Sequence, residues 1–439
     1  MEEKKYKNPS EDLETVDLGD VRLSKRLKTS TEERMYKRSK TRSTSKGFYR
    51  LLSNEKFEYG KLEKSCQEGT IARISEERRV LLVQDSTDIN LNGHKKTEGL
   101  GYCSLRVRGI QAHSCLALSE YGIPLGLLSQ SYETRTEAKS SMSVQEKKSR
   151  PIEEKESYRW VETLRKSVKM IPEHIETIVL CDREGDIYEV YEEAQELGSG
   201  FVIRVAQDRK TETSEKLFTR IRKSPVIGYA TIEIPRDAAK NRKSRVARMA
   251  VSSCKVRVSK SKNSLSLNIV RIVEVNKTDE QPIEWILATS LPVENSDDAM
   301  QAVEYYVQRW KIERFHYVLK QGCNVEEIQQ RSVERILPVI LICSMIANFI
   351  LAMTYLGRIA PALPCDLLFD EDEWKMLYRF VKKTKTPPKT PYSIAEAIQF
   401  LGILGVGKRA PSDGEYGVKA VWLGLKAFYS AYDLLMGQG

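Results

Sequence analysis

The sequence predicts an α/β protein in which helices flank a mixed β-sheet. Two short apolar runs, VLLVQD and TIVLCD, have the length of buried strands, and each ends in an aspartate, Asp85 and Asp182. A long helical segment with a glutamate follows much later in the chain. A carboxylate at the end of a buried strand is costly unless it is paired or bound to a metal. Since strand ends are rigid and meet at one edge of a sheet, these acids predict a metal site there.

The bulk composition indicates a soluble globular protein with a polyanionic partner. The chain has 439 residues, enough for two to four domains, and 41% are hydrophobic and 30% charged. A formal net charge of +10 favours nucleic acid as the partner. Eight Cys without a CxxC pair and only four His argue against a zinc site. The first residues, MEEKKYKNPSED, do not resemble a signal peptide, so we expect a cytoplasmic protein without membrane contact.

The N-terminal region, residues 1–70, is predicted to be a helical DNA-binding domain. Its run ERMYKRSKTRSTSKGFYRLL places basic side chains among small hydroxyls and aromatic rings, which suits phosphate contact. We expect Arg42, Lys46 and Arg50 to bind DNA. The alternative is a solvated basic face without a partner.

The first candidate acid is Asp85. Taken alone, it can equally begin a turn with Ser86 and Thr87. Asp88, close by, is a weaker candidate. The segments predicted next are two strands in residues 109–132, a charged surface loop in 134–157 and a helix in 158–171.

The second candidate acid, Asp182, follows the predicted strand 175–181 and precedes Arg183 at a strand-to-helix turn. Without its partners, Asp182 can be interpreted as a simple cap of the next helix. Residues 201–205 are predicted to form a further strand, which contains Arg204.

Residues 211–284 are predicted to form an all-β insertion. Short segments with β-branched residues and few helix signals support this prediction. A basic tract within it includes Arg242 and Lys243. Trp285 follows the insertion, and taken alone it can be a core residue on a strand.

The third candidate acid is Glu313, on a predicted helix from Asp298 to Gln321 that contains neither Pro nor Gly and that Ser296 is expected to cap. At about 100° per residue, four polar side chains fall within an arc of about 60°. These four are Tyr306, Arg309, Glu313 and Lys320. A neighbouring apolar stripe is predicted to pack on the core, and its members are Met300, Val303, Val307, Trp310 and Val318.

This grouping suits a site in which Glu313 binds a cation while Tyr306, Arg309 and Lys320 hold phosphates. The alternative is a solvated helix face with ion pairs between residues four apart. Residues 336–356 carry no charge and have the length of a membrane span, but we expect a buried helix behind the segment that contains Glu313. Two further helices are predicted near residues 392–404 and 417–435.

The spacing Tyr-x2-Arg-x3-Glu-x6-Lys, from Tyr306 to Lys320, resembles the signature of bacterial cut-and-paste DDE transposases of the insertion sequence four family, which includes the transposase of transposon five. The segments LGDVRLSKRL and GVGKRAPSDGEYG also resemble the family's N-terminal and C-terminal regions. Trp422 matches a Trp on a helix that pairs two subunits. The chain departs from the family pattern at Tyr416 and Leu423, among other positions.

The resemblance implies three domains. These are a helical DNA-binding domain at 1–70, an RNase H-like catalytic domain at 71–370 that includes the insertion, and a helical dimerisation domain at 371–439. Asp85, Asp182 and Glu313 would form a catalytic triad holding two Mg²⁺ ions, with Mn²⁺ able to substitute. Further DNA contacts implied or expected are those of Trp285, on a flipped base, and of Arg204, Arg183, Arg242 and Lys243.

The implied function is cut-and-paste transposition by a homodimer. The protein would bind the inverted ends of its own element, cut them through a hairpin intermediate and join them to double-stranded target DNA. The alternatives are an RNase H-like nuclease without strand transfer and a DNA-binding protein derived from a transposase. The bacterial family implies a protein associated with the nucleoid.

Overall fold

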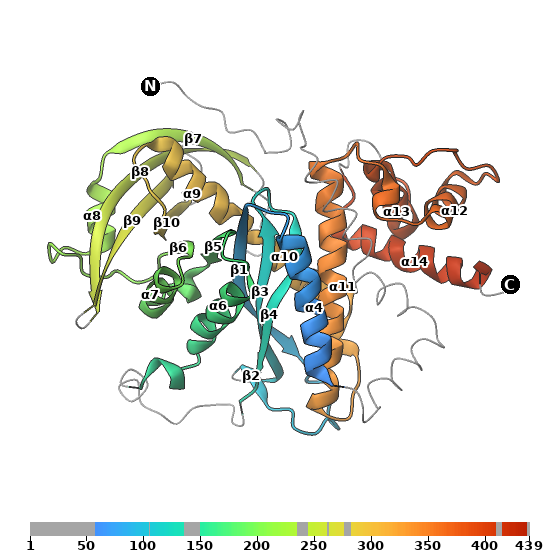
Figure 1. Cartoon of the computed structure of the whole chain (residues 1–439), viewed down its shortest axis with the longest axis horizontal. Helices are drawn as coiled ribbons and strands as arrows, with labels where there is room; N and C mark the ends of the chain where they lie inside the picture. Colours follow the sequence, from blue (N-terminus) through green and yellow to red (C-terminus); the bar gives the residue numbers. More distant parts are fainter. Residues whose placement is uncertain are drawn as a thin grey trace.

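A computed structural model of the chain describes residues 58–104, 106–135, 150–234, 245–260, 263–275, 282–409 and 415–436. Within these residues the strands form one ten-stranded sheet, flanked by helices (Figure 1). The strand order is β2-β3-β1-β5-β6-β10-β9-β8-β7, and β4 pairs with β3. Strands β1, β5 and β6 are parallel and the other pairs are antiparallel, so the predicted mixed α/β sheet is confirmed.

The strands are β1 (Arg79–Asn90), β2 (Tyr102–Ser104), β3 (Val107–Ser119), β4 (Pro124–Glu133), β5 (Glu176–Cys181), β6 (Gly200–Arg204), β7 (Val226–Ile234), β8 (Arg245–Lys260), β9 (Asn263–Glu274) and β10 (Glu284–Thr289). The α-helices are α4 (Tyr59–Ile74), α6 (Tyr158–Met170), α7 (Tyr188–Glu196), α8 (Leu217–Lys223), α9 (Ser296–Gln308), α10 (Trp310–Tyr317), α11 (Val333–Ile359), α12 (Glu371–Lys382), α13 (Ile394–Val406) and α14 (Val418–Met436). Shorter helical segments are η1 (Ile152–Glu154), η2 (Arg183–Gly185), the π-helix η4 (Val318–Gly322), η5 (Val325–Glu327) and η6 (Cys365–Leu367).

The two apolar runs form the centre of the sheet. Strands β1 and β5 pair in parallel between Val80 and Val83 on one side, and helices cover both faces, which explains why the runs show no alternation of polar residues. Strand β1 was expected to end at Asp85. It continues to Asn90, because β3 remains paired with it over that length. Only the pairing with β5 stops before the acid.

The region from 211 to 284 continues the central sheet instead of forming a separate β unit. Strand β10 pairs with β6 on one side and with β9 on the other, and β8 and β7 follow outward. The prediction of an all-β insertion was wrong in one respect, since the region contains α8. Leu217 and Ile221, four residues apart, are both buried and hold this short helix against the sheet.

The helix expected from Asp298 to Gln321 is divided. Asn295, rather than Ser296, caps α9, which ends at Gln308, and α10 begins after Arg309. Around Arg309 the backbone makes hydrogen bonds between residues three apart, at 3.1 Å, which tightens the turn. The π-helix η4 follows α10 and carries Lys320.

The predicted orientation of this segment was partly wrong. Met300, Val303 and Val318 are buried as expected, but Val307 and Trp310 are 43% and 47% exposed. Tyr306 and Arg309 are buried instead, because their face of the helix lies against the protein.

Helix α11 is the buried helix expected near residues 336–356. It is long and apolar enough to cross a membrane by length and composition, but 94% of its apolar window is buried inside the protein. It packs on β4 and α10 on one side and on α13 and α14 on the other, and so lies between the sheet and the C-terminal helices (Figure 1). Helices α13 and α14 were predicted, whereas α12 was not.

Candidate active site

Asp85 lies on β1, where its carboxylate is mostly buried. Its side chain is 15% exposed, and the backbone N–H of Ser86 donates to Oδ1 at 2.8 Å. Burial raises the pKa of Asp85 to about 7, since the charged form loses its hydration; Arg309 opposes this rise, and the charges of Asp182 and Glu313 add to it. The three predicted acids are therefore close enough to interact electrostatically.

Asp182 immediately follows β5, as predicted. Its Oδ1 accepts a hydrogen bond of 2.8 Å from the backbone N–H of Glu184, so the side chain also caps η2. The capping role and the position near Asp85 are compatible, because β5 pairs in parallel with β1 and so brings the two acids near each other.

Arg309 connects two of the acids. Its Nη2 donates to Glu313 Oε1 at 2.6 Å, and its Nη1 lies 3.6 Å from Asp85 Oδ2. The guanidinium is 9% exposed, and its Nε and Nη1 are buried without a hydrogen-bond partner. We expected Arg309 to hold phosphates; in this structure it supplies the positive charge that buried carboxylates need.

The donor set suits a hard divalent cation in chemistry, since carboxylate oxygens are the preferred ligands of such ions. Within the described parts of the chain, however, no three His, Cys, Asp or Glu side chains lie close enough together to hold one metal ion. Arg309 lies between Asp85 and Glu313 instead. The pKa of Asp85 is raised by burial and two guanidinium nitrogens of Arg309 have no hydrogen-bond partner, so the polar groups of this site are not fully satisfied by the protein.

Three of the expected DNA contacts form one cluster next to Arg309. The rings of Trp285 and Tyr306 meet edge to face at 5.5 Å, and the guanidinium of Arg204 lies 6.0 Å from the Trp285 ring. Arg309 lies 5.7 Å from the Tyr306 ring. Burial lowers the pKa of Arg204, and the charges of the nearby Arg183 and Arg309 lower it further. Trp285 is only partly buried, which is compatible with both a core role and stacking on a base.

Of the remaining expected contacts, Lys320 and Arg183 lie on short helical segments and the other five lie outside the described residues. Lys320, on η4, is near His316 and Cys103. Burial is the main influence on both groups, lowering the pKa of His316 and raising that of Cys103, and the charge of Lys320 adds to the first shift and opposes the second. Arg183 is exposed on η2 beside Asp182. The other expected contacts, Arg42, Lys46, Arg50, Arg242 and Lys243, lie outside the described residues.

His316 was not singled out from the sequence. It follows Glu313 by three residues on α10, is 7% exposed, and its Nε2 has no hydrogen-bond partner. Burial lowers its pKa to about 3, so it is neutral near pH 7. The sequence signal that could have identified His316 is its spacing of three residues from Glu313, which places both side chains on the same face of a helix.

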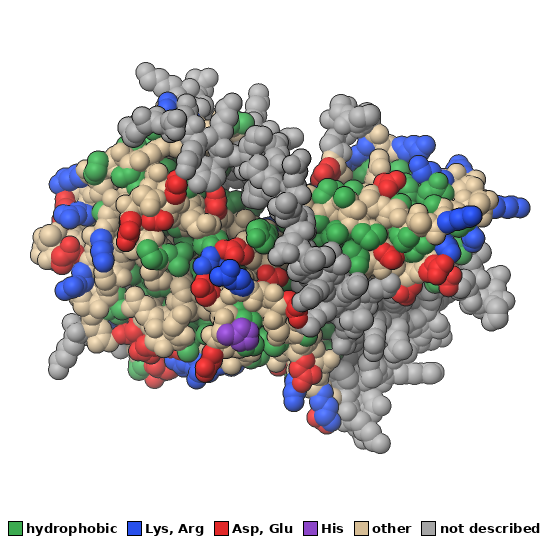
Figure 2. All heavy atoms as spheres, turned by 45° about the horizontal axis from the view of Figure 1, so that its top comes forward, with side chains coloured by type: hydrophobic (Ala, Val, Ile, Leu, Met, Phe, Trp, Pro, Cys, Tyr) green, Lys and Arg blue, Asp and Glu red, His purple; other side chains and the backbone are tan. Residues whose placement is uncertain are grey.

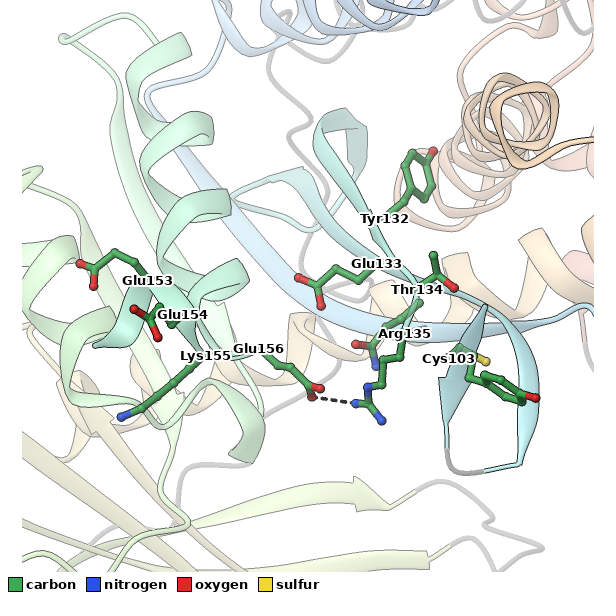
Figure 3. A pocket seen from close by; sticks show the side chains of 11 residues that line it. Cys103, Tyr132, Glu133, Thr134, Arg135, Glu153, Glu154, Lys155 and Glu156 are labelled. Atoms are coloured by element: carbon green, nitrogen blue, oxygen red, sulfur yellow. Dashed lines mark hydrogen bonds and ion pairs between the residues drawn. The ribbon is translucent and has the colours of Figure 1, made fainter. Parts of the chain in front are cut away.

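The surface carries charges of both signs, and the described part of the chain has a pocket next to β4 and η1. Figure 2 shows acidic and basic side chains interspersed on one face, with many basic ones along the edge that contains α8 and β8. A pocket of about 540 Å³ is lined by Tyr132, Glu133, Arg135 and Glu156, among others, and by none of the expected site residues (Figure 3). This pocket is therefore not the place where the three acids lie.

Two family models match the chain. Residues 161–349 match the Transposase DDE domain and residues 345–432 match the Transposase Tn5 dimerisation domain. The first range contains Asp182, Arg309 and Glu313, and the two ranges overlap within α11. DDE transposases catalyse DNA cleavage and strand transfer and generally use divalent metal ions, and the second match indicates a homodimer acting on DNA. The chain therefore belongs to the DDE transposases related to that of Tn5.

Proposed function

We propose that the protein is a cut-and-paste transposase that cleaves and joins the inverted ends of its own element. The supporting observation is that the buried Asp85 interacts with Asp182 and Glu313 next to Arg309, although the acids are far apart in the sequence. Cleavage proceeds through a hairpin intermediate in a dimeric complex of two ends, and the freed end is joined to target DNA.

Asp85, Asp182 and Glu313 are the proposed ligands of two Mg²⁺ ions, for which Mn²⁺ can substitute. Bound ions of this kind activate the attacking water or 3′-hydroxyl and stabilise the leaving oxygen. The protein's own contribution is to hold the carboxylates in place, two of them through the backbone N–H groups of Ser86 and Glu184.

Tyr306, Arg309 and Lys320 are proposed to bind the phosphates that flank the cut, so that the line of attack is fixed. Two nitrogen atoms of Arg309 make no hydrogen bond and have unused donors for phosphate oxygens. Trp285 stacks on a base taken out of the duplex, and Arg204 and the exposed Arg183 supply positive charge beside it.

The domain boundaries stay a proposal, with DNA binding at 1–70, catalysis at 71–370 and dimerisation at 371–439. The last boundary coincides with the start of α12 at Glu371. Helix α11 spans the overlap of the two matched ranges, so it connects the two regions physically. A cytoplasmic, nucleoid-associated location also stays a prediction.

The test is nicking of duplex DNA that carries the inverted ends of the element, with and without Mg²⁺. We expect activity only with Mg²⁺ or Mn²⁺, and a loss of at least about 100-fold in Asp182→Asn and in Glu313→Gln, since each removes a proposed metal ligand. Asp88→Asn, a carboxylate change on the same strand as Asp85, is the matched control. Equal activity in wild type and both ligand variants would remove the proposed site. Cut but never joined products would favour a nuclease without strand transfer.

A further inference from the structure

Arg159, in the first turn of α6, reaches three other parts of the structure although its side chain is only 9% exposed. Its Nε donates to Ser86 Oγ at 3.2 Å, on β1. Its Nη1 lies 3.6 Å from Glu133 on β4, and its Nη2 lies 3.8 Å from Glu184 on η2. Nη1 also donates to the backbone carbonyl of Glu156 at 2.8 Å, next to the pocket of Figure 3, in which Glu133 and Glu156 are drawn.

Two of these partners are the residues that hold the catalytic carboxylates. The backbone N–H of Ser86 donates to Asp85 Oδ1, and the backbone N–H of Glu184 donates to Asp182 Oδ1, each at 2.8 Å. Arg159 therefore joins the two backbone segments that orient Asp85 and Asp182.

The surroundings fix Arg159 in place. The neighbouring Trp160 is 1% exposed and meets the ring of His113 edge to face at 4.6 Å, while His113 Nδ1 lies 2.9 Å from Ser86 Oγ. Gly185 lets η2 approach this helix closely, since an added Cβ would lie 3.1 Å from the Trp160 ring. The guanidinium is thus held between rigid elements and is not presented to solvent as a DNA contact.

We propose that Arg159 is a positioning residue that sets the separation of the Asp85 and Asp182 carboxylates and so the affinity of the site for divalent cations. A planar guanidinium with several donors can contact a hydroxyl, a carbonyl and two carboxylates at once, which an ammonium cannot do. It also neutralises Glu184 and Glu133, whose charges would otherwise disfavour two further ionised carboxylates nearby. This inference rests on the proposed metal-binding role of Asp85 and Asp182.

The test compares Mn²⁺ binding by calorimetry, in the full-length protein without DNA, for wild type, Arg159→Met and Arg159→Lys. Arg165→Met is the matched control, because Arg165 lies on the same helix and makes a two-point contact with Glu193, at 2.7 and 2.6 Å, away from the acids. Removing a group that orients metal ligands typically weakens metal affinity about 10- to 100-fold. We expect that loss in Arg159→Met, a smaller loss in Arg159→Lys, and no change in the control.

Two further measurements separate positioning from folding and from DNA binding. The Mg²⁺ concentration for half-maximal nicking should rise by the same factor as the Mn²⁺ dissociation constant, while binding of end DNA in EDTA stays within about twofold. If Arg159→Met binds Mn²⁺ as tightly as the wild type does, the inference is contradicted, even if that variant is less stable. If Arg159→Met does not fold, the Mn²⁺ affinity of Arg159→Lys is the test, and an affinity equal to that of the wild type contradicts the inference.

The same experiment distinguishes failure of the inference from failure of the proposed function. If Asp182→Asn loses Mn²⁺ binding and Arg159→Met does not, only the positioning role is wrong. If wild type itself binds no Mn²⁺, or Asp182→Asn binds it normally, the proposed metal site is wrong, and the role of Arg159 with it.

Discussion

Replacing Asp85 by Asn should stabilise the metal-free protein at neutral and alkaline pH while it removes a proposed metal ligand. The reason is that Asp85 is buried, and the ionised carboxylate lacks full compensation from Arg309, which lies 3.6 Å away. Asn has a similar shape and carries no charge, so the unfavourable burial of a negative charge disappears.

The magnitude follows from the pKa. Burial raises the pKa of Asp85 from 3.8 to about 7, so between these values the folded protein keeps a proton that the unfolded chain has released. The free energy of unfolding of the wild type therefore falls as the pH rises through this range, and levels off above about pH 7. A difference of about three pKa units corresponds to about 4 kcal/mol in total, of which about 2–3 kcal/mol is lost between pH 5 and pH 8.

The assay is urea denaturation of wild type and Asp85→Asn in EDTA at pH 5 and pH 8. We expect the variant to gain about 2–3 kcal/mol relative to wild type between the two values. Asp88→Asn, on the same strand, controls for the loss of one negative charge. At pH 8, Mg²⁺ should narrow the difference in the free energy of unfolding between the variant and the wild type, because it binds the folded wild type more tightly than the folded variant. A relative stability of Asp85→Asn that is the same at both pH values would refute the reasoning.

Two other changes test the DNA site and the C-terminal helices. Trp285→Ala should slow cleavage of the element ends by about 10-fold or more without changing Mn²⁺ affinity, because the ring contacts Tyr306 rather than the carboxylates; a parallel loss of metal binding would contradict this. Gly424→Ala should lower the free energy of unfolding by about 1–3 kcal/mol and weaken dimerisation in sedimentation experiments, since an added Cβ would overlap the carbonyl of Leu401. At Gly417, where an added Cβ meets no heavy atom within 4 Å, the same substitution is the control and should leave dimerisation unchanged.

The sequence was sufficient for elements whose burial is nearly uniform. The run before Asp85, the run before Asp182 and the uncharged segment within α11 are apolar on every side, and the structure buries them on every side. Such segments need no knowledge of orientation, because every face meets the core. The spacing from Tyr306 to Lys320 identified the family for a similar reason, since it is a property of the chain and not of its packing.

Prediction failed where a polar face packs inward. A helix that turns by a uniform 100° per residue was predicted to direct Val307 and Trp310 toward the core. In the structure both side chains are exposed, and Arg309 is buried. A prediction from hydrophobic periodicity takes charged side chains to face water, but Arg309 faces the protein interior, where it pairs with Glu313 and Asp85. The same ion pairs accompany the break between α9 and α10 at Arg309.

By itself the sequence determined the class of fold and the family, and it predicted the three acids, because apolar runs and residue spacings are local properties. The tertiary structure decided that the β-rich region extends the central sheet through β9 and β10, that Arg309 pairs with two of the acids, and that Arg159 contacts the segments holding two of them. These features depend on pairings between residues far apart in the chain, and such pairings form only when the sheet brings its strands together.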